Sequence, residues 1–95
     1  MRILVVEDDL ELAAQLCAAL EAAGFAVDQE HDGEAASMAG TVEVYSAAVL
    51  DLGLPRKDGL SVLRDWREAG CTWPVLVLTA RNRWRDKVAG LNAGA

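Results

Sequence analysis

The sequence predicts an α/β domain in which helices cover both faces of a parallel sheet, which is called a doubly wound sheet. Short apolar runs of strand length alternate along the chain with longer stretches whose apolar residues have helical spacing. The chain has 95 residues, of which 53% are hydrophobic, so it can form one packed core but not two.

The first apolar run and the stretch after it predict a strand, a helix and a second strand. Residues 2–6 are continuously apolar after Arg2 and rich in β-branched side chains, which is typical of a strand buried on both faces. Residues 10–23 have leucine at every fourth position, which predicts a helix with one apolar face. Asp9 and Gly24 stand where the first cap and the terminal glycine of this helix are expected. A second strand is expected over residues 25–30.

Three further elements are predicted before residue 71. A short helix is expected over residues 33–41, and a third strand over residues 47–50 runs into Asp51. A third helix begins near Leu60 and ends at Gly70.

The last part of the chain predicts one more strand and one more helix. Residues 74–78 form a fourth apolar run that ends at Thr79, and residues 84–93 have helical spacing. Strands that alternate with helices through short loops imply parallel pairing with right-handed crossovers. The sequence stops at residue 95, where a fifth strand would be expected. We therefore predict one domain over residues 1–95 that is incomplete at its C-terminus.

The charge of the chain is acidic and unevenly distributed. Nine basic and fifteen acidic residues give a net charge of −6, which argues against a nucleic-acid surface on these residues. Residues 1–50 contain ten of the acids and only one basic residue. No apolar run approaches the ~18 residues of a membrane span, and no signal-peptide pattern follows Met1. We expect a cytoplasmic protein with no membrane partner and a buried, reduced Cys17.

Acidic side chains follow two of the predicted strands. Glu7 and Asp8 come directly after the first strand, Asp51 follows the third, and Thr79 follows the fourth. These side chains should lie together, because the carboxyl ends of parallel strands share one edge of the sheet. Clustered carboxylates raise each other's pKa unless a cation lies among them, and hard oxygen ligands suit Mg²⁺. The pattern predicts a metal site in which a carboxylate can act as a nucleophile toward phosphorus.

The alternative is that these acids are ordinary loop residues and helix caps. We favour that interpretation for Asp9 alone. It is weak for Glu7, Asp8 and Asp51 together, because an acid at the end of a buried strand costs free energy without a partner.

Four segments of the chain resemble the receiver domains of bacterial response regulators. They are Ile3-Leu4-Val5-Val6-Glu7-Asp8-Asp9, Val49-Leu50-Asp51-Leu52-Gly53-Leu54-Pro55 with Asp58-Gly59, Val77-Leu78-Thr79-Ala80-Arg81, and Lys87-Val88-Ala89-Gly90-Leu91 with Ala93-Gly94-Ala95. The resemblance implies a flavodoxin-like fold with strand order 2-1-3-4, the family's fifth strand and helix being absent from this chain. The second segment is most similar to regulators that carry a winged-helix DNA-binding domain.

The resemblance implies a role for individual residues. Asp51 would be the phosphorylated residue, and Thr79 with Ala80 would form the segment that responds to the phosphoryl group. The ligands of Mg²⁺ (or Mn²⁺) would be three carboxylates and one backbone carbonyl, from Glu7, Asp8, Asp51 and Gly53. Receiver domains also use a lysine at the end of strand five, and neither Lys57 nor Lys87 stands at that position.

The fourth predicted helix suggests a surface for self-association. By resemblance, Lys87, Val88 and Leu91 lie on the face that forms the dimer surface of DNA-binding response regulators. Arg83 and Trp84 stand where the sequence departs from the family, and they would add a basic and aromatic surface for a partner. A solvated loop followed by a partly buried helix stripe explains them equally well. We also expect the fourth strand to be an edge in this chain, so that the chain is either oligomeric or poorly folded.

Three functions fit these features. The first is a receiver module that accepts a phosphoryl group from a sensor histidine kinase, catalyses only its own phosphorylation and dephosphorylation, and contacts DNA only through an output domain outside these residues. The second is an enzyme with an aspartate nucleophile, which usually has a second aspartate two residues later; here that residue is Gly53, which argues against turnover of an external substrate. The third is a phosphorylation-independent interaction module.

Overall fold

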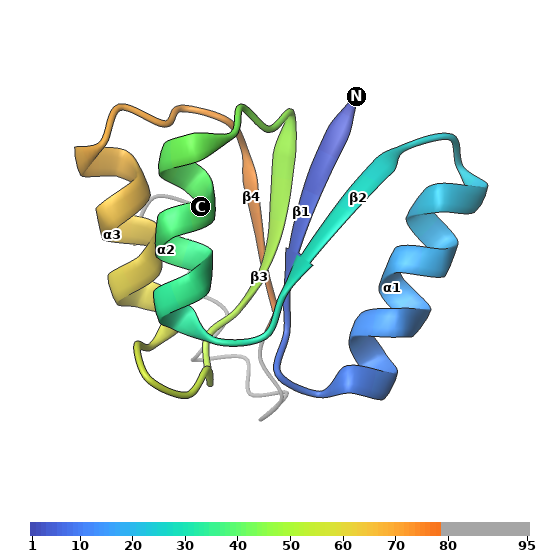
Figure 1. Cartoon of the computed structure of the whole chain (residues 1–95), viewed down its shortest axis with the longest axis horizontal. Coiled ribbons are helices and arrows are strands. Elements are labelled where there is room, and N and C mark those ends of the chain that lie inside the picture. The colour runs from blue at the N-terminus through green and yellow to red at the C-terminus, as the bar shows by residue number, and fades with distance from the viewer. Residues whose placement is uncertain (79–95) are drawn as a thin grey trace.

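The computed structural model describes residues 1–78, which form four strands and three helices (Figure 1). In chain order these are β1 (Arg2–Val6), α1 (Leu10–Ala22), β2 (Ala26–Glu30), α2 (Gly33–Val42), β3 (Ala47–Asp51), α3 (Gly59–Glu68) and β4 (Val75–Leu78). The predicted helix over residues 84–93 and the end of the fourth strand at Thr79 lie outside the described residues.

The four strands form one parallel sheet in the order β2-β1-β3-β4. Helix α1 covers one face, and α2 with α3 cover the other (Figure 1). The register places Val6 beside Leu50 of β3 and beside Glu30 of β2. The predicted doubly wound sheet and its strand order are therefore confirmed.

The larger part of the core lies between the sheet and the α2–α3 pair. Trp66 of α3 is fully buried there, and its indole nitrogen donates a hydrogen bond of 3.0 Å to the carbonyl of Ala36 in α2. Gly40 of α2 allows this packing, since a Cβ at that residue would lie 2.4 Å from the Trp66 ring. A smaller cluster on the α1 face contains the buried, unpaired thiol of Cys17, as predicted.

An aspartate caps the N-terminus of each of the three described helices. The carboxylate of Asp9 accepts hydrogen bonds from the amides of Glu11 and Leu12 at 3.1 and 3.2 Å, which confirms it as the cap of α1. Gly24 has a φ of +98°, so it follows the end of α1 in the backbone conformation that favours glycine. Asp58 caps α3, which therefore begins at Gly59, one residue earlier than predicted.

The starts of two predicted strands differ by one residue from the structure. The second strand begins at Ala26, because the amide of Phe25 bonds to the carbonyl of Leu20 and closes the end of α1. The fourth strand begins at Val75, since Pro74 has no N–H to donate to the sheet. Within residues 1–78, no helix is long and apolar enough to cross a lipid bilayer.

Candidate functional site

Three carboxylates meet at the carboxyl ends of β1 and β3. Glu7 and Asp8 follow β1, and Asp51 is the last residue of β3, the neighbouring strand. One carboxylate oxygen from each residue lies within 4.8 Å of those from the other two. Glu7 is 2% exposed and Asp51 is 1% exposed, whereas Asp8 faces solvent. The structure therefore brings together the acids that the sequence placed at one edge of the sheet.

The carboxylate of Asp51 is buried without a hydrogen-bond donor. Neither of its oxygens accepts a hydrogen bond from any described residue. Burial raises the pKa of Asp51 because it disfavours the charged form, and the negative charge of Asp8 raises the pKa further. The nearby amide of Gly53 only partly opposes this rise. A bound cation would stabilise a buried carboxylate in this state.

Glu7 is in a similar environment. Burial is the main cause that raises its pKa to about 7, and the charges of Asp51 and Asp8 add to the rise. The amide of Asp9 opposes this effect by donating a hydrogen bond of 3.1 Å to the Glu7 carboxylate. His31, which is solvent-exposed, contacts the backbone carbonyl of Glu7 at 2.9 Å through Nδ1.

The loop after Asp51 is closed at its base by backbone hydrogen bonds. The amide of Gly59 donates to the carbonyl of Leu52 at 3.0 Å, and the Leu52 amide donates to the carbonyl of Leu78 at 3.1 Å. Gly59 is required by this closure, because a Cβ there would lie 2.4 Å from the carbonyl oxygen of Asp51. The closed loop keeps Gly53, whose carbonyl is the fourth predicted ligand, beside the Asp51 carboxylate.

The tip of this loop contains a γ-turn centred on Arg56. The amide of Lys57 donates to the carbonyl of Pro55 at 2.8 Å, and Arg56 has a φ of +70°. This turn is rare because residues other than glycine are strained at positive φ. The Pro55 carbonyl also accepts a hydrogen bond of 3.1 Å from the amide of Gly33, at the start of α2.

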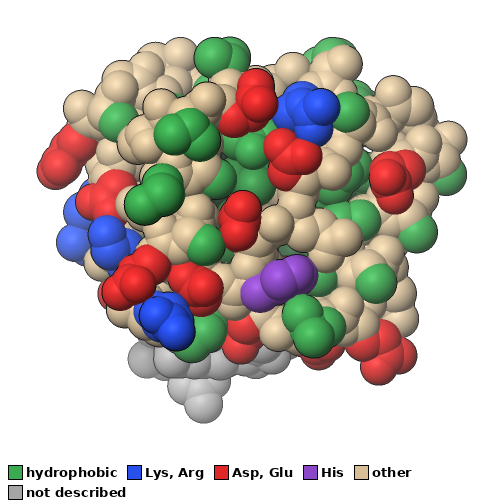
Figure 2. Space-filling view, in the orientation of Figure 1, with side chains coloured by type: hydrophobic (Ala, Val, Ile, Leu, Met, Phe, Trp, Pro, Cys, Tyr) green, Lys and Arg blue, Asp and Glu red, His purple; other side chains and the backbone are tan. Residues whose placement is uncertain are grey.

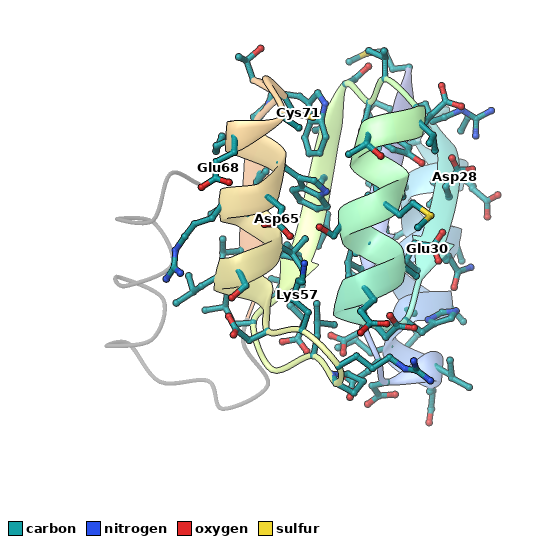
Figure 3. The ribbon with its side chains drawn as sticks, turned by 60° about the vertical axis from the view of Figure 1, so that its left-hand side comes forward. Asp28, Glu30, Lys57, Asp65, Glu68 and Cys71 are labelled. Atoms are coloured by element: carbon teal, nitrogen blue, oxygen red, sulfur yellow. The ribbon has the colours of Figure 1, made fainter. Side chains whose placement is uncertain are left out.

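Three side chains hold the loop tip against α2 and α3. The ammonium group of Lys57 lies 2.5 Å from the Asp65 carboxylate (Figure 3). The same carboxylate accepts a 2.6 Å hydrogen bond from the Ser37 hydroxyl. The Lys57 side chain lowers the pKa of Asp65, and Asp65 raises the pKa of Lys57. We call Ser37, Lys57 and Asp65 the loop clamp. No sequence signal predicts this clamp, because no motif connects residues so far apart on two helices and a loop.

The donor set of the cluster suits a hard divalent cation. Carboxylate and carbonyl oxygens are the ligands preferred by Mg²⁺ and Mn²⁺, and the buried Asp51 oxygens have no protein donor among the described residues. The predicted switch residues Thr79 and Ala80 lie outside the part of the chain that the structure describes. So do the residues of the predicted association face, namely Arg83, Trp84, Lys87, Val88 and Leu91.

Known proteins resemble this chain over its full length. Residues 3–95 match the response regulator receiver domain family. The transcriptional regulatory protein PhoP of Escherichia coli (strain K12) is 45% identical over 95 residues, and the response regulator protein PmrA of Pseudomonas aeruginosa is 47% identical over 95 residues. The chain covers 43% of each of these two proteins, so it spans less than half of their length.

Solved structures agree with the fold. The receiver domain of the sensor histidine kinase PA1611 from Pseudomonas aeruginosa PAO1, with a magnesium ion in its active-site cleft, is 34% identical with a TM-score of 0.87. The match covers 98% of this chain and 78% of that one. The Francisella response regulator 1452 receiver domain is 29% identical with a TM-score of 0.90, over 99% of this chain and 78% of that one. The sheet order, the acidic cluster and these matches together show that the chain belongs to the receiver domain family of two-component response regulators.

Proposed function

We propose that Asp51 accepts a phosphoryl group in a reaction that depends on Mg²⁺ or Mn²⁺. One observation supports this most strongly: the Asp51 carboxylate is 1% exposed, has no hydrogen-bond donor among residues 1–78, and lies beside two more carboxylates. Such an arrangement is unfavourable by itself and becomes favourable when a divalent cation neutralises it. Glu7, Asp8, Asp51 and the Gly53 carbonyl would hold the metal.

The proposed reaction is a direct phosphoryl transfer. A carboxylate oxygen of Asp51 forms a bond to phosphorus while the phosphorus–nitrogen bond of a phosphohistidine donor breaks, and the electron pair stays on the imidazole nitrogen. The bound metal supplies charge neutralisation at the phosphoryl oxygens. The chain holds the nucleophile in place at the end of β3, and backbone hydrogen bonds close the base of the loop that follows it. The donor would be a sensor histidine kinase.

The phosphoryl group would act as a switch rather than as a step in substrate turnover. We propose that it shifts an equilibrium between two states of the domain through Thr79 and Ala80, and that no external substrate is processed. The relatives PhoP and TctD are transcriptional regulatory proteins. The output of this chain would then be the control of transcription, and DNA would be contacted through an output domain outside these residues. The protein would act in the cytoplasm. It would associate with itself through the face of the predicted fourth helix.

Intact mass spectrometry tests the central step. The chain is incubated with Mg²⁺ and a small-molecule phosphodonor, beside an Asp51→Ala control and a sample with EDTA. We expect one phosphoryl adduct on the chain and none on either control. Replacement of Mg²⁺ by Mn²⁺ should preserve the adduct. An unmodified chain under all conditions would reject phosphorylation of these residues and favour a phosphorylation-independent interaction module.

A further inference from the structure

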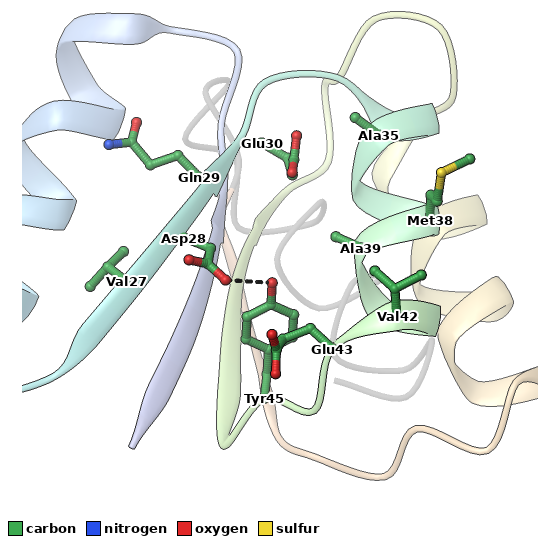
Figure 4. Close-up of a pocket in the computed structure, with 10 residues that line it drawn as sticks. All are labelled: Val27, Asp28, Gln29, Glu30, Ala35, Met38, Ala39, Val42, Glu43 and Tyr45. Carbon is green, nitrogen blue, oxygen red and sulfur yellow. Dashed lines mark hydrogen bonds between the residues drawn. The ribbon is translucent and has the colours of Figure 1, made fainter.

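A groove of about 660 Å³ lies between β2, which is an edge strand, and α2 (Figure 4). It is separate from the acidic cluster, since neither Glu7, Asp8 nor Asp51 lines it. In the space-filling view the groove is a hollow with apolar side chains at its floor and acidic side chains at its rim, where a basic side chain lies beside them (Figure 2).

The sequence of two elements explains why this groove is open. Strands of parallel sheets are usually apolar on both faces, yet β2 turns Asp28 and Glu30 toward the α2 side (Figures 3 and 4). The facing residues of α2 include Ala35 and Ala39, whose side chains are too short to cover the strand. The three helices within residues 1–78 therefore leave this part of the sheet uncovered.

The α2 wall has the pattern of a helix-packing surface. Its four lining residues occupy positions i, i+3, i+4 and i+7 of the helix: Ala35, Met38, Ala39 and Val42. This spacing is the one by which helices pack against one another. Met38 is 67% exposed and Val42 is 77% exposed, so two large apolar side chains of this stripe face solvent. Methionine adapts to the shape of different partners.

The groove is also negatively charged. Asp28, Glu30 and Glu43 line it, and none of its lining residues is basic. Asp28 is already paired, through a 2.7 Å ion pair with Arg2 and a 2.8 Å hydrogen bond from the Tyr45 hydroxyl. Within the described residues, Glu30 and Glu43 have no cationic partner. A partner for this groove therefore needs both apolar and basic side chains.

We propose that the groove is a docking site for a cationic amphipathic helix of a partner protein. The apolar face of that helix packs on Met38 and Val42, and its lysine or arginine side chains pair with Glu30 and Glu43. A helix fits better than an extended segment because the α2 stripe offers helix-packing ridges. The interaction does not depend on phosphorylation of Asp51, since no residue of the acidic cluster takes part.

Amide NMR titration of the chain with designed peptides tests this proposal. The probe is a helical peptide of roughly four turns with leucine at i, i+3, i+4 and i+7 and lysine on the flanks. There are two control peptides. One has the same composition in scrambled order, and the other has glutamate in place of lysine. All titrations contain saturating Mg²⁺, so that the acidic cluster does not compete for lysine. We expect saturable shifts confined to β2, α2 and Tyr45 with the designed peptide only.

Variants of the groove separate the two kinds of contact. We expect Glu30→Gln with Glu43→Gln to weaken binding about three- to tenfold and to reduce its salt dependence. Met38→Ser with Val42→Ser should weaken binding by about tenfold or more. The matched control, Glu21→Gln with Glu68→Gln, removes two exposed acids elsewhere and should leave affinity unchanged. Circular dichroism verifies that each variant is folded.

Several results would overturn the docking site. One is absence of binding at millimolar peptide, and another is equal affinity for the scrambled peptide. Shifts spread over other acidic surfaces, or full affinity in both groove variants, would also reject it.

Discussion

The side chain of Asp51 is buried at the end of β3 with two other carboxylates beside it. Its position follows from the register of β1 and β3, which brings the ends of both strands to the same level. Without a cation, the folded state holds desolvated negative charges that the unfolded chain exposes to water. The residue that serves the proposed chemistry therefore reduces the stability of the metal-free fold.

Replacement of Asp51 by asparagine should stabilise the metal-free chain. The change keeps the side-chain size and removes a buried charge, so we expect the free energy of unfolding to rise by about 1–3 kcal/mol. Urea denaturation in EDTA at mildly alkaline pH measures this effect. Asp8→Asn is the control and should give a smaller gain, because Asp8 is exposed. A loss of stability in Asp51→Asn would contradict this account.

Arg56 provides a second test at the residue scale, because its φ of +70° is strained for any side chain with a Cβ. Glycine adopts this conformation without strain, so Arg56→Gly should be more stable than Arg56→Ala by about 0.5–1 kcal/mol. The alanine variant is the proper reference, since both changes remove the exposed ion pair with Glu34. Thermal unfolding of the two variants would reveal the difference, and equal midpoints would argue against strain at the turn.

At the scale of elements, the loop between β3 and α3 is attached to both helices of its face. The Gly33 amide holds the Pro55 carbonyl, and the loop clamp ties Lys57 to α3 and α2. These contacts fix a strained turn close to Gly53, whose carbonyl is a proposed metal ligand. The position of this ligand therefore depends on side chains that do not themselves contact the metal.

Breaking the loop clamp should weaken Mg²⁺ binding. For Asp65→Asn or Lys57→Met we expect the dissociation constant of Mg²⁺ to rise about two- to fivefold, consistent with the modest energy of a half-exposed ion pair. Isothermal titration calorimetry measures it. The reversed pair Lys57→Asp with Asp65→Lys should recover part of the affinity. Glu34→Gln, which breaks only the exposed pair with Arg56, is the control and should change nothing.

The sequence predicted elements well where one local signal determines them. Apolar runs marked β1 and β3, aspartate marked the start of α1, and the shared edge of a parallel sheet predicted that Glu7 and Asp51 would meet. The loop clamp and the groove between β2 and α2 could not be predicted in this way. Both depend on side chains that come together only when α2 is packed on the sheet, as Ser37 and Asp65 do across 28 residues.

At the scale of the whole molecule, negative charge dominates the described part of the chain. Residues 1–78 contain fourteen acidic and five basic residues, a balance of −9, within a chain whose net charge is −6. The most tightly gathered of these charges are in the acidic cluster. Divalent cations bound at one site should therefore stabilise the entire domain, because α1, β1 and β3 all support that site.

Mg²⁺ should raise the stability of the chain by binding the folded state alone. At a concentration one hundred times the dissociation constant, we expect an increase of about 2.7 kcal/mol in the free energy of unfolding. Thermal melts at constant ionic strength, with NaCl replacing MgCl₂ as the control, measure this gain. In Asp51→Asn most of it should disappear. An equal gain from NaCl would assign the effect to general screening instead.

The place of β1 inside the sheet affects how the chain assembles during its synthesis. Strand β1 has β2 on one side and β3 on the other, so it is an inner strand although it is made before the other three described strands. One of its edges has no partner until β2 has left the ribosome. The other edge stays open until residues 47–51 follow, after the whole of α2 has been translated. A nascent chain of this protein therefore lacks the partner for one edge of an apolar strand until these residues have been added.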